Sequence, residues 1–330
     1  MRQIKHLFIF SALVLLMGFS FSNFLGIYHQ TILALCGINI ILAVSLNLVN
    51  GFTGQFSLGH AGFMAVGAYV SAALTTLWLP TLTNPFLMTE IGVNLFFLFA
   101  LLAGGIAAGL TGFLVGVPSL RLKGDYLAVV TLGFGEIIRI FILNIEPIGG
   151  ARGLIGIPQL SNLYWIFGFV LLICIWIHRI VSSIPGKQFM AVRDDETATS
   201  AMGLSTTRIK VRSFVYASFF AGIAGGLFAH YIAYLNPATF NFNYSFQIVA
   251  MVVLGGMGSL TGSVAAAILL TGLLEALRPL QDLTGVDLRM VIYALTLIVL
   301  MLTRPEGMFG RHEIWEFFKK FKKSPQGFVR

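Results

Sequence analysis

Residues 93–117 read VNLFFLFALLAGGIAAGLTGFLVGV, a continuous run without a charged residue. A transmembrane α-helix needs about 20 mainly apolar residues, because each residue adds about 1.5 Å and the hydrocarbon core is about 30 Å thick. The segment therefore predicts a helix that crosses a membrane.

The rest of the chain has the same character. Of its 330 residues, 57% are hydrophobic and only 10% are charged, and the mean hydropathy is +0.88. A soluble domain has about 25% charged residues. A transmembrane β-barrel would need alternating segments of about ten residues, which the sequence lacks. We therefore predict an all-α, polytopic transmembrane helical bundle of about ten spans. The predicted spans are 7–25, 31–49, 58–79, 93–117, 125–145, 163–181, 213–235, 246–261, 263–278 and 288–303.

Basic residues predict the orientation of these spans. With the N-terminus inside, Arg121, Lys123 and the basic residues of 187–212 all fall inside, and the outside loops 80–92 and 236–245 contain no Lys or Arg. Arg152 is the basic exception in an outside loop. This distribution follows the positive-inside rule. It accounts for the net charge of +8 without a nucleic-acid partner.

The run 246–278 is too long for one ordinary crossing. If it crosses twice, the basic tail lies inside, as the same rule favours; one pass plus a re-entrant hairpin is the alternative. We expect both termini to be cytoplasmic, with a transmembrane domain over 1–310 and a basic cytoplasmic tail over 311–330.

Small residues recur at intervals of four within two spans. This spacing lets helices approach closely in a membrane, where hydrophobicity alone does not drive them together. The residues predicted to pack in this way are Ala108, Gly112 and Gly116, and Ser218, Gly222 and Gly226.

Two glycine-rich breaks, GQFSLGHAGF at 54–63 and GGMGSLTG at 255–262, each follow an apolar span and precede a helix of small residues. Interrupted helices in matching halves point to the substrate path of transporters. A helix beginning near His60 would offer free N–H groups to an anion such as an amino-acid carboxylate. Alternatively, these polar groups satisfy broken backbone hydrogen bonds. The candidate path residues here are Gln55, Ser57, Gly59, His60, Gly255, Gly256 and Gly258.

Glu136 and Arg139 lie three residues apart within span 125–145, so they share a helix face and can pair. The pair either fixes helix packing or lines a substrate path; Glu136 is the candidate path residue. Glu275 and Arg278 repeat the spacing near a span end, where packing is the favoured interpretation.

The longest polar stretch is 184–212. Its centre, residues 191–203, predicts a short helix that ends at Gly203. The stretch is either a solvated loop or a docking element for a cytoplasmic partner.

Enzyme motifs are scarce. No phosphate-binding loop occurs, since Gly186-Lys187 is followed by Gln188, and Gly256-Met257-Gly258 lacks the third glycine of a dinucleotide motif. No HExxH or CxxC spacing is found. We predict that the chain is not an enzyme and has no catalytic residue, metal or cofactor.

Several segments together resemble the permease subunits of branched-chain amino acid ABC importers of the LivM type. They are GFTGQFSLGHAGFMAVGAY at 51–69, RLKGDYLAVVTLGFGEIIRI at 121–140, GGARGLIGIP at 149–158, RDDETATSAMGLSTTRIKVRSFVYASFFAGIAGGLFAHY at 193–231 and MVVLGGMGSLTGSVAAA at 251–267.

This resemblance implies a multi-pass protein of the bacterial inner membrane. Its expected partners are a second homologous permease, two cytoplasmic ATP-binding subunits and a periplasmic amino-acid-binding protein. The resemblance also implies that the loop around Glu196 docks into the ATPase, although Thr197 and Thr199 interrupt the usual Glu-Ala-Ala pattern. The expected coupling residues are Arg193, Asp194, Asp195, Glu196, Ala198, Ala201 and Gly203.

Two other functions remain open at this point. Related permeases carry urea and short amides, although 149–158 looks more like the amino-acid branch. A stand-alone secondary transporter would use Glu136 and His60 to relay protons. It would leave the 184–212 stretch without a purpose.

Overall fold

The computed structural model describes residues 26–78, 89–120, 122, 124–277, 289–303, 307–310 and 313. Within them, six helices are long and apolar enough to cross a membrane. These are α2 (Ile27–Asn47, continued by a π-helical turn over Leu48–Phe52), α3 (His60–Ala73, continued over Leu74–Trp78), α4 (Glu90–Ser119), α5 (Asp125–Leu143), α6 (Leu163–Ser182) and α9 (Thr206–Ile232). The shorter elements are α7 (Ile184–Asp194), α8 (Glu196–Ala201), α10 (Phe242–Gly255), α11 (Leu260–Ala276), α13 (Arg289–Thr303), β1 (Leu154–Ile155), β2 (Tyr234–Leu235) and three 3₁₀ turns, Glu146–Ile148, Gly150–Arg152 and Pro237–Phe240.

The two most deeply buried long helices are α2 and α9, and α9 packs against α3 and α4. Glycine makes this packing close. A β-carbon at Gly67 of α3 would lie 2.2 Å from Gly222 Cα of α9, and one at Gly112 of α4 would lie 2.3 Å from Ser218 Oγ. The predicted small-residue contacts are therefore confirmed between α4 and α9, with α3 as a third participant.

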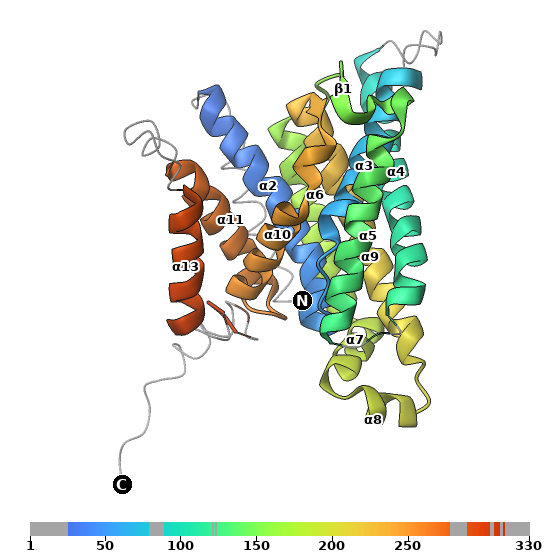
Figure 1. The fold of residues 1–330 in the computed structure, drawn as a ribbon, viewed down its shortest axis with the longest axis vertical. Coiled ribbons are helices and arrows are strands. Elements are labelled where there is room, and N and C mark those ends of the chain that lie inside the picture. Colours follow the sequence, from blue (N-terminus) through green and yellow to red (C-terminus); the bar gives the residue numbers. More distant parts are fainter. Residues whose placement is uncertain are drawn as a thin grey trace.

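Helices α10, α11 and α13 group on one side of the bundle (Figure 1). A short turn over 256–259 joins α10 to α11, as the predicted break requires. These helices hold 14 and 17 residues, so they span only about 21 and 25 Å.

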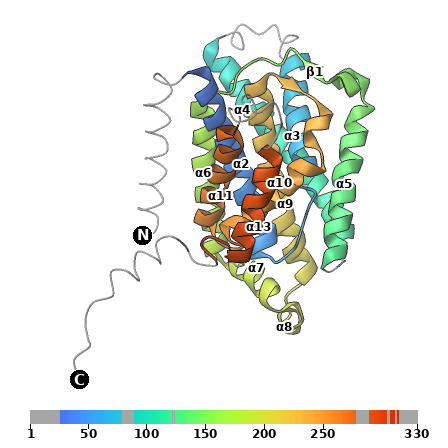
Figure 2. The same cartoon turned by 60° about the vertical axis from the view of Figure 1, so that its left-hand side comes forward.

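The two ends of the bundle carry different structures. At one end β1 pairs antiparallel with β2, with Leu154 opposite Leu235, and at the other α7 and α8 project beyond the long helices (Figure 1). Helix α5 is the least buried of the long helices and lies at one edge of the bundle (Figure 2).

An all-α membrane bundle is thus confirmed. Span 7–25 lies outside the described residues, and each of the other predicted spans overlaps a helix. The count of about ten crossings and the side of each terminus stay predictions.

One local prediction was wrong: residues 191–203 do not form a single helix. Asp195 has extended backbone angles, and its Oδ1 accepts hydrogen bonds from the N–H groups of Thr197 and Ala198. The aspartate thereby ends α7 and caps the start of α8, a competition between side chain and helix that aspartate favours. Gly203 does terminate the segment, with φ of +82°.

Candidate functional site

The first glycine-rich break is an irregular segment between two helices. The π-helical turn after α2 ends at Phe52, residues 54–59 have no regular secondary structure, and α3 begins at His60. The Leu58 N–H donates to Thr131 Oγ1 of α5 at 3.0 Å. A β-carbon at Gly59 would lie 2.3 Å from the Thr131 carbonyl oxygen. Glycine at 59 is therefore required because the backbone passes directly against α5.

The polar side chains of this break are buried inside the protein. His60 Nε2 lies 2.9 Å from Ser45 Oγ, and the Ala61 N–H donates to Ser245 Oγ. The Ser57 N–H donates to Asn50 Oδ1. The start of α3 is thus satisfied by neighbouring side chains, which matches the alternative of internal hydrogen bonding. The role of Ser57 and His60 in a substrate path stays a prediction.

Gln55 differs from its neighbours. Its side chain is 7% exposed, and within the described part of the chain its Oε1 has no hydrogen-bond partner. A buried carbonyl of this kind is rare in native proteins and needs an explanation.

Asn47, which the sequence analysis did not single out, ties the second break to α2. Its Nδ2 donates to the Ser259 carbonyl oxygen and to Ser263 Oγ, and its Oδ1 accepts from the Gly258 N–H. The sequence did contain a signal for Asn47: it is an amide inside an apolar span, where each polar group needs a hydrogen-bond partner.

The second break is closely packed and partly left-handed. A β-carbon at Gly255 would lie 2.5 Å from the Gly262 carbonyl group, so α10 and α11 approach backbone to backbone. Gly256 and Gly258 have φ of +110° and +98°, which only glycine adopts readily. The Asn47 contacts place this second break beside the end of α2, the helix that leads into the first break.

Residues near the C-terminus cap the same turn. The Met308 and Phe309 N–H groups donate to the carbonyl oxygens of Leu254 and Gly255. Glu313 accepts hydrogen bonds from the N–H groups of Leu260 and Thr261. One short segment therefore satisfies the end of α10 and the start of α11, groups that a helix leaves unpaired. Glu313 lies within the predicted tail 311–330, a boundary that stays a prediction.

Helix α8 presents an exposed surface held in place by a buried charge. Ala198, Ala201 and Gly203 are exposed, and Met202 is 83% exposed. Glu196 pairs with Lys210 of α9 at 2.7 Å, and the Lys210 side chain is only 4% exposed. Sequence reasoning missed Lys210, which sits among the basic residues at the start of α9.

Arg193 faces the opposite way from this surface. It lies in the last turn of α7, where its Nη1 donates to the Gly51 carbonyl oxygen at 3.2 Å and its Nε and Nη2 donate to Asp194. The expected coupling residues therefore divide into an exposed group on α8 and an inward-facing arginine on α7.

Glu136 pairs with Arg139 at 2.7 Å, as the spacing predicts. The pair is on α5, and its side chains are 30% and 26% exposed. Gly135, beside Glu136, lies next to Gly59, so the pair borders the first break. The Tyr28 hydroxyl donates a hydrogen bond to the Glu275 carboxylate. Arg278, the predicted partner of Glu275, lies outside the described residues.

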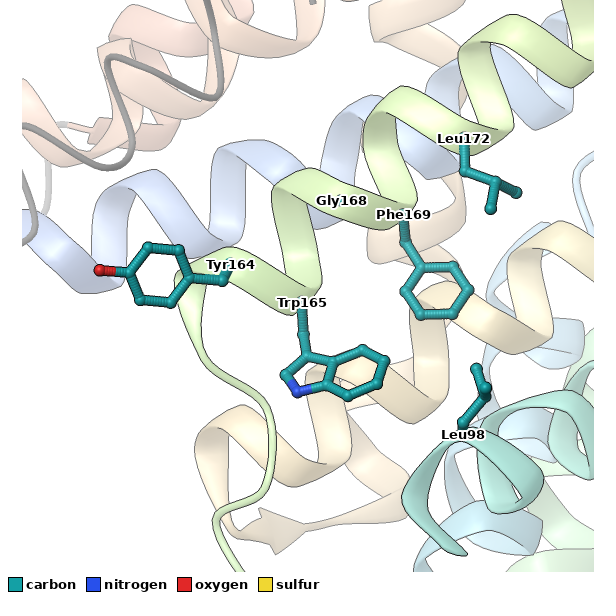
Figure 3. A pocket seen from close by; sticks show the side chains of 6 residues that line it. All are labelled: Leu98, Tyr164, Trp165, Gly168, Phe169 and Leu172. Atoms are coloured by element: carbon teal, nitrogen blue, oxygen red, sulfur yellow. The ribbon is translucent and has the colours of Figure 1, made fainter. Parts of the chain in front are cut away.

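An apolar groove of about 420 Å³ opens beside α6. In Figure 3, the Trp165 and Phe169 side chains lie near Leu98 of α4 along this groove. A zwitterionic amino acid needs partners for its ammonium and carboxylate groups. The groove lining, which is completed by Tyr164, Gly168 and Leu172, is almost wholly apolar and suits lipid chains better.

Residues 28–301 match the family described as "Branched-chain amino acid transport system / permease component". The chain is 34% identical to "High-affinity branched-chain amino acid transport system permease protein LivM" of Escherichia coli (strain K12), over 92% of this chain and 75% of that protein. It is 25% identical to permease protein BraD of Pseudomonas aeruginosa, over 87% and 98% of the two chains.

Other relatives are named as permeases for different substrates. The chain is 25% identical to "Ribose import permease protein RbsC" of Haemophilus influenzae, over 86% of this chain and 85% of that protein. No solved structure matches the chain significantly.

The family match covers most of the chain, including both glycine-rich breaks and the α7–α8 segment. These relatives are membrane transport components rather than enzymes. The chain therefore belongs to the family of permease components of branched-chain amino acid transport systems.

Proposed function

We propose that the chain is the membrane-spanning subunit of an ATP-driven importer for branched-chain amino acids in the bacterial inner membrane. A second homologous permease, two cytoplasmic ATPases and a periplasmic binding protein complete the importer. The substrate proposal rests on the LivM and BraD relatives. LivM is more similar to this chain in identity than the sugar permease is, at 34% against 25%. BraD has the same identity as the sugar permease, but the match covers 98% of BraD and 85% of the sugar permease.

The observation that carries the ATP-driven mechanism is the α7–α8 segment. The segment projects from one end of the bundle (Figure 1), and its residues Ala198, Ala201 and Met202 are exposed. The buried Lys210 anchors it through Glu196. The surface of α8 is exposed and is linked to the long helix α9. It therefore suits a partner protein whose conformational change moves α8 and, with it, α9. Alternating access then needs only a different affinity of the two states for the ATPase and substrate.

The proposed topology has about ten crossings with both termini cytoplasmic. The turn between α10 and α11 meets Asn47 near the end of α2, which is the α7–α8 side of the bundle. This position supports two passes over 242–276, although both helices are short.

The proposed substrate path runs along α5 and the two breaks. The partly exposed pair of Glu136 and Arg139 offers one carboxylate and one guanidinium. These charges complement the ammonium and carboxylate groups of a zwitterionic amino acid. A partly exposed ion pair within a span is also unfavourable in contact with lipid. We therefore place this face of α5 toward the second permease or the substrate path.

The first test is purification of the tagged chain from native membranes in mild detergent, followed by mass spectrometry. We expect a second permease and two ATPases to accompany the chain. Vesicles containing that complex and its binding protein should then take up leucine, and not urea, when ATP is supplied. A chain that purifies alone, or uptake without ATP, would contradict the proposal.

Replacing Ala201 by arginine tests the docking surface. The exposed position accommodates the longer side chain, so the subunit should fold, but a bulky charge on α8 should reduce the ATPase recovered with it by at least tenfold. Ala151→Arg, an exposed alanine at the opposite end of the bundle, is the matched control and should leave ATPase recovery unchanged. Equal recovery with both variants would remove α8 from the contact.

A further inference from the structure

Three segments that are far apart in the sequence meet at one point. We define the arginine junction as Asn47, Gly51, Gly54, Arg193 and Gly258. Arg193 Nη1 donates to the Gly51 carbonyl oxygen, and Asn47 Oδ1 accepts from the Gly258 N–H at 2.9 Å. A β-carbon at Gly51 would lie 2.3 Å from the Gly258 nitrogen. The junction thus joins the end of α2, the turn between α10 and α11, and the end of α7.

Arg193 completes a helix end at this junction. The Gly51 carbonyl belongs to the last turn of the helical run that begins with α2, where carbonyl groups have no partner further along the helix. A cation at this position also interacts favourably with the helix dipole. The guanidinium satisfies that carbonyl and at the same time binds Asp194.

Both glycine-rich breaks make room for the arginine. A β-carbon at Gly54 would lie 2.8 Å from Arg193 Cγ, and one at Gly258 would lie 3.3 Å from Arg193 Nη1. The two glycines also have positive φ, +71° and +98°. Arg193 therefore packs directly against one glycine of each break, and a side chain at either position would meet both the arginine and an unfavourable backbone conformation.

Helix α7 is well placed to transmit motion. Phe189 and Val192 are 1% and 4% exposed and anchor the helix in the core, and α8 follows it directly. The orphan Oε1 of Gln55, next to Gly54, gives the first break an unused acceptor.

We infer that Arg193 is a positioning residue that transmits movement of α7 and α8 to both glycine-rich breaks, so that they rearrange together. This inference rests on the proposed importer function. The partner ATPase moves the exposed surface of α8, Lys210 conveys that movement to α9, and Arg193 conveys it to the breaks.

The test uses the complete importer in lipid vesicles with its binding protein, and measures leucine uptake and ATP hydrolysis on the same sample. Arg193→Ala should lower the number of leucine molecules moved per ATP by at least tenfold. Arg193→Lys should lower it less, about threefold, because an ammonium group can donate to Gly51 but lacks the planar fork that also holds Asp194. Arg179→Ala, an exposed arginine in the last turn of α6, is the control and should keep the ratio of the original chain.

Different failures have different meanings. If both Arg193 variants keep the ratio, or lower uptake and hydrolysis in equal proportion, the inference is overturned, because the residue would then matter for assembly and not for transmission. If the alanine variant does not assemble, the lysine variant decides by the same ratio. If the unaltered importer hydrolyses ATP without moving leucine, the proposed function fails first.

Discussion

Replacing Gly222 by valine should strongly destabilise the folded subunit. A β-carbon at this position would lie 2.5 Å from Ala108 Cβ, 2.8 Å from the Gly104 carbonyl oxygen and 3.0 Å from Gly105 Cα. Two of these three neighbours are backbone atoms, which cannot move aside without separating α9 from α4. Overpacking of a core commonly costs about 1–3 kcal/mol, and we expect at least the upper value here. The midpoint of thermal unfolding should fall by about 10 °C or more.

The measurement is unfolding in detergent, followed with a dye that reacts with the buried thiol of Cys36. Gly168→Val is the matched control. Gly168 also lies within a long helix, but an added β-carbon meets nothing within 4 Å. This control should unfold near the midpoint of the unaltered chain. Similar midpoints for the two valine variants would show that α4 and α9 do not meet as closely as described.

The helices could be predicted because their cause is local. Length and apolarity alone identify a span such as 93–117, and the spacing of Ala108 and Gly112 identifies the face that packs. The partner of that face was not predictable in the same way. Gly67 and Ser71 of α3, four residues apart, contact Gly222 and Gly226 of α9, but the spacing of small residues within one span does not say which other span it will meet.

The candidate site was only half predictable for a related reason. Both glycine-rich breaks and the α7–α8 segment stand out as departures from apolar sequence. Their meeting point depends on pairs separated by 142 residues, Gly51 with Arg193, and by 211 residues, Asn47 with Gly258. No local pattern encodes such a pair. The split of 191–203 at Asp195 was missed because a capping aspartate resembles any other charged residue until its backbone angles are known.

Replacing Asn47 by alanine should impair both stability and transport. The substitution removes three hydrogen bonds at the meeting point of the two breaks. The Ser259 carbonyl keeps other donors, the Ser263 N–H and hydroxyl, so its loss is small. The part-buried Gly258 N–H loses its acceptor, and since a fully buried unsatisfied group costs roughly 1–3 kcal/mol, we expect the lower part of that range here. With the cavity left by the amide, we expect about 2–4 kcal/mol of destabilisation and at least a tenfold loss of ATP-driven uptake.

Two further substitutions separate hydrogen bonding from volume. Asn47→Leu restores the volume but not the acceptor, so it should recover part of the stability and little of the uptake. Asn144→Ala is the control. Among the described residues, that exposed amide donates to Ile140 of the helix it follows, so its loss should change neither quantity. If the leucine variant transports normally, packing alone holds the two breaks together. If it folds but does not transport, the hydrogen bond from Gly258 has a role beyond stability, because the turn between α10 and α11 must then keep a defined position against α2 while the importer changes state.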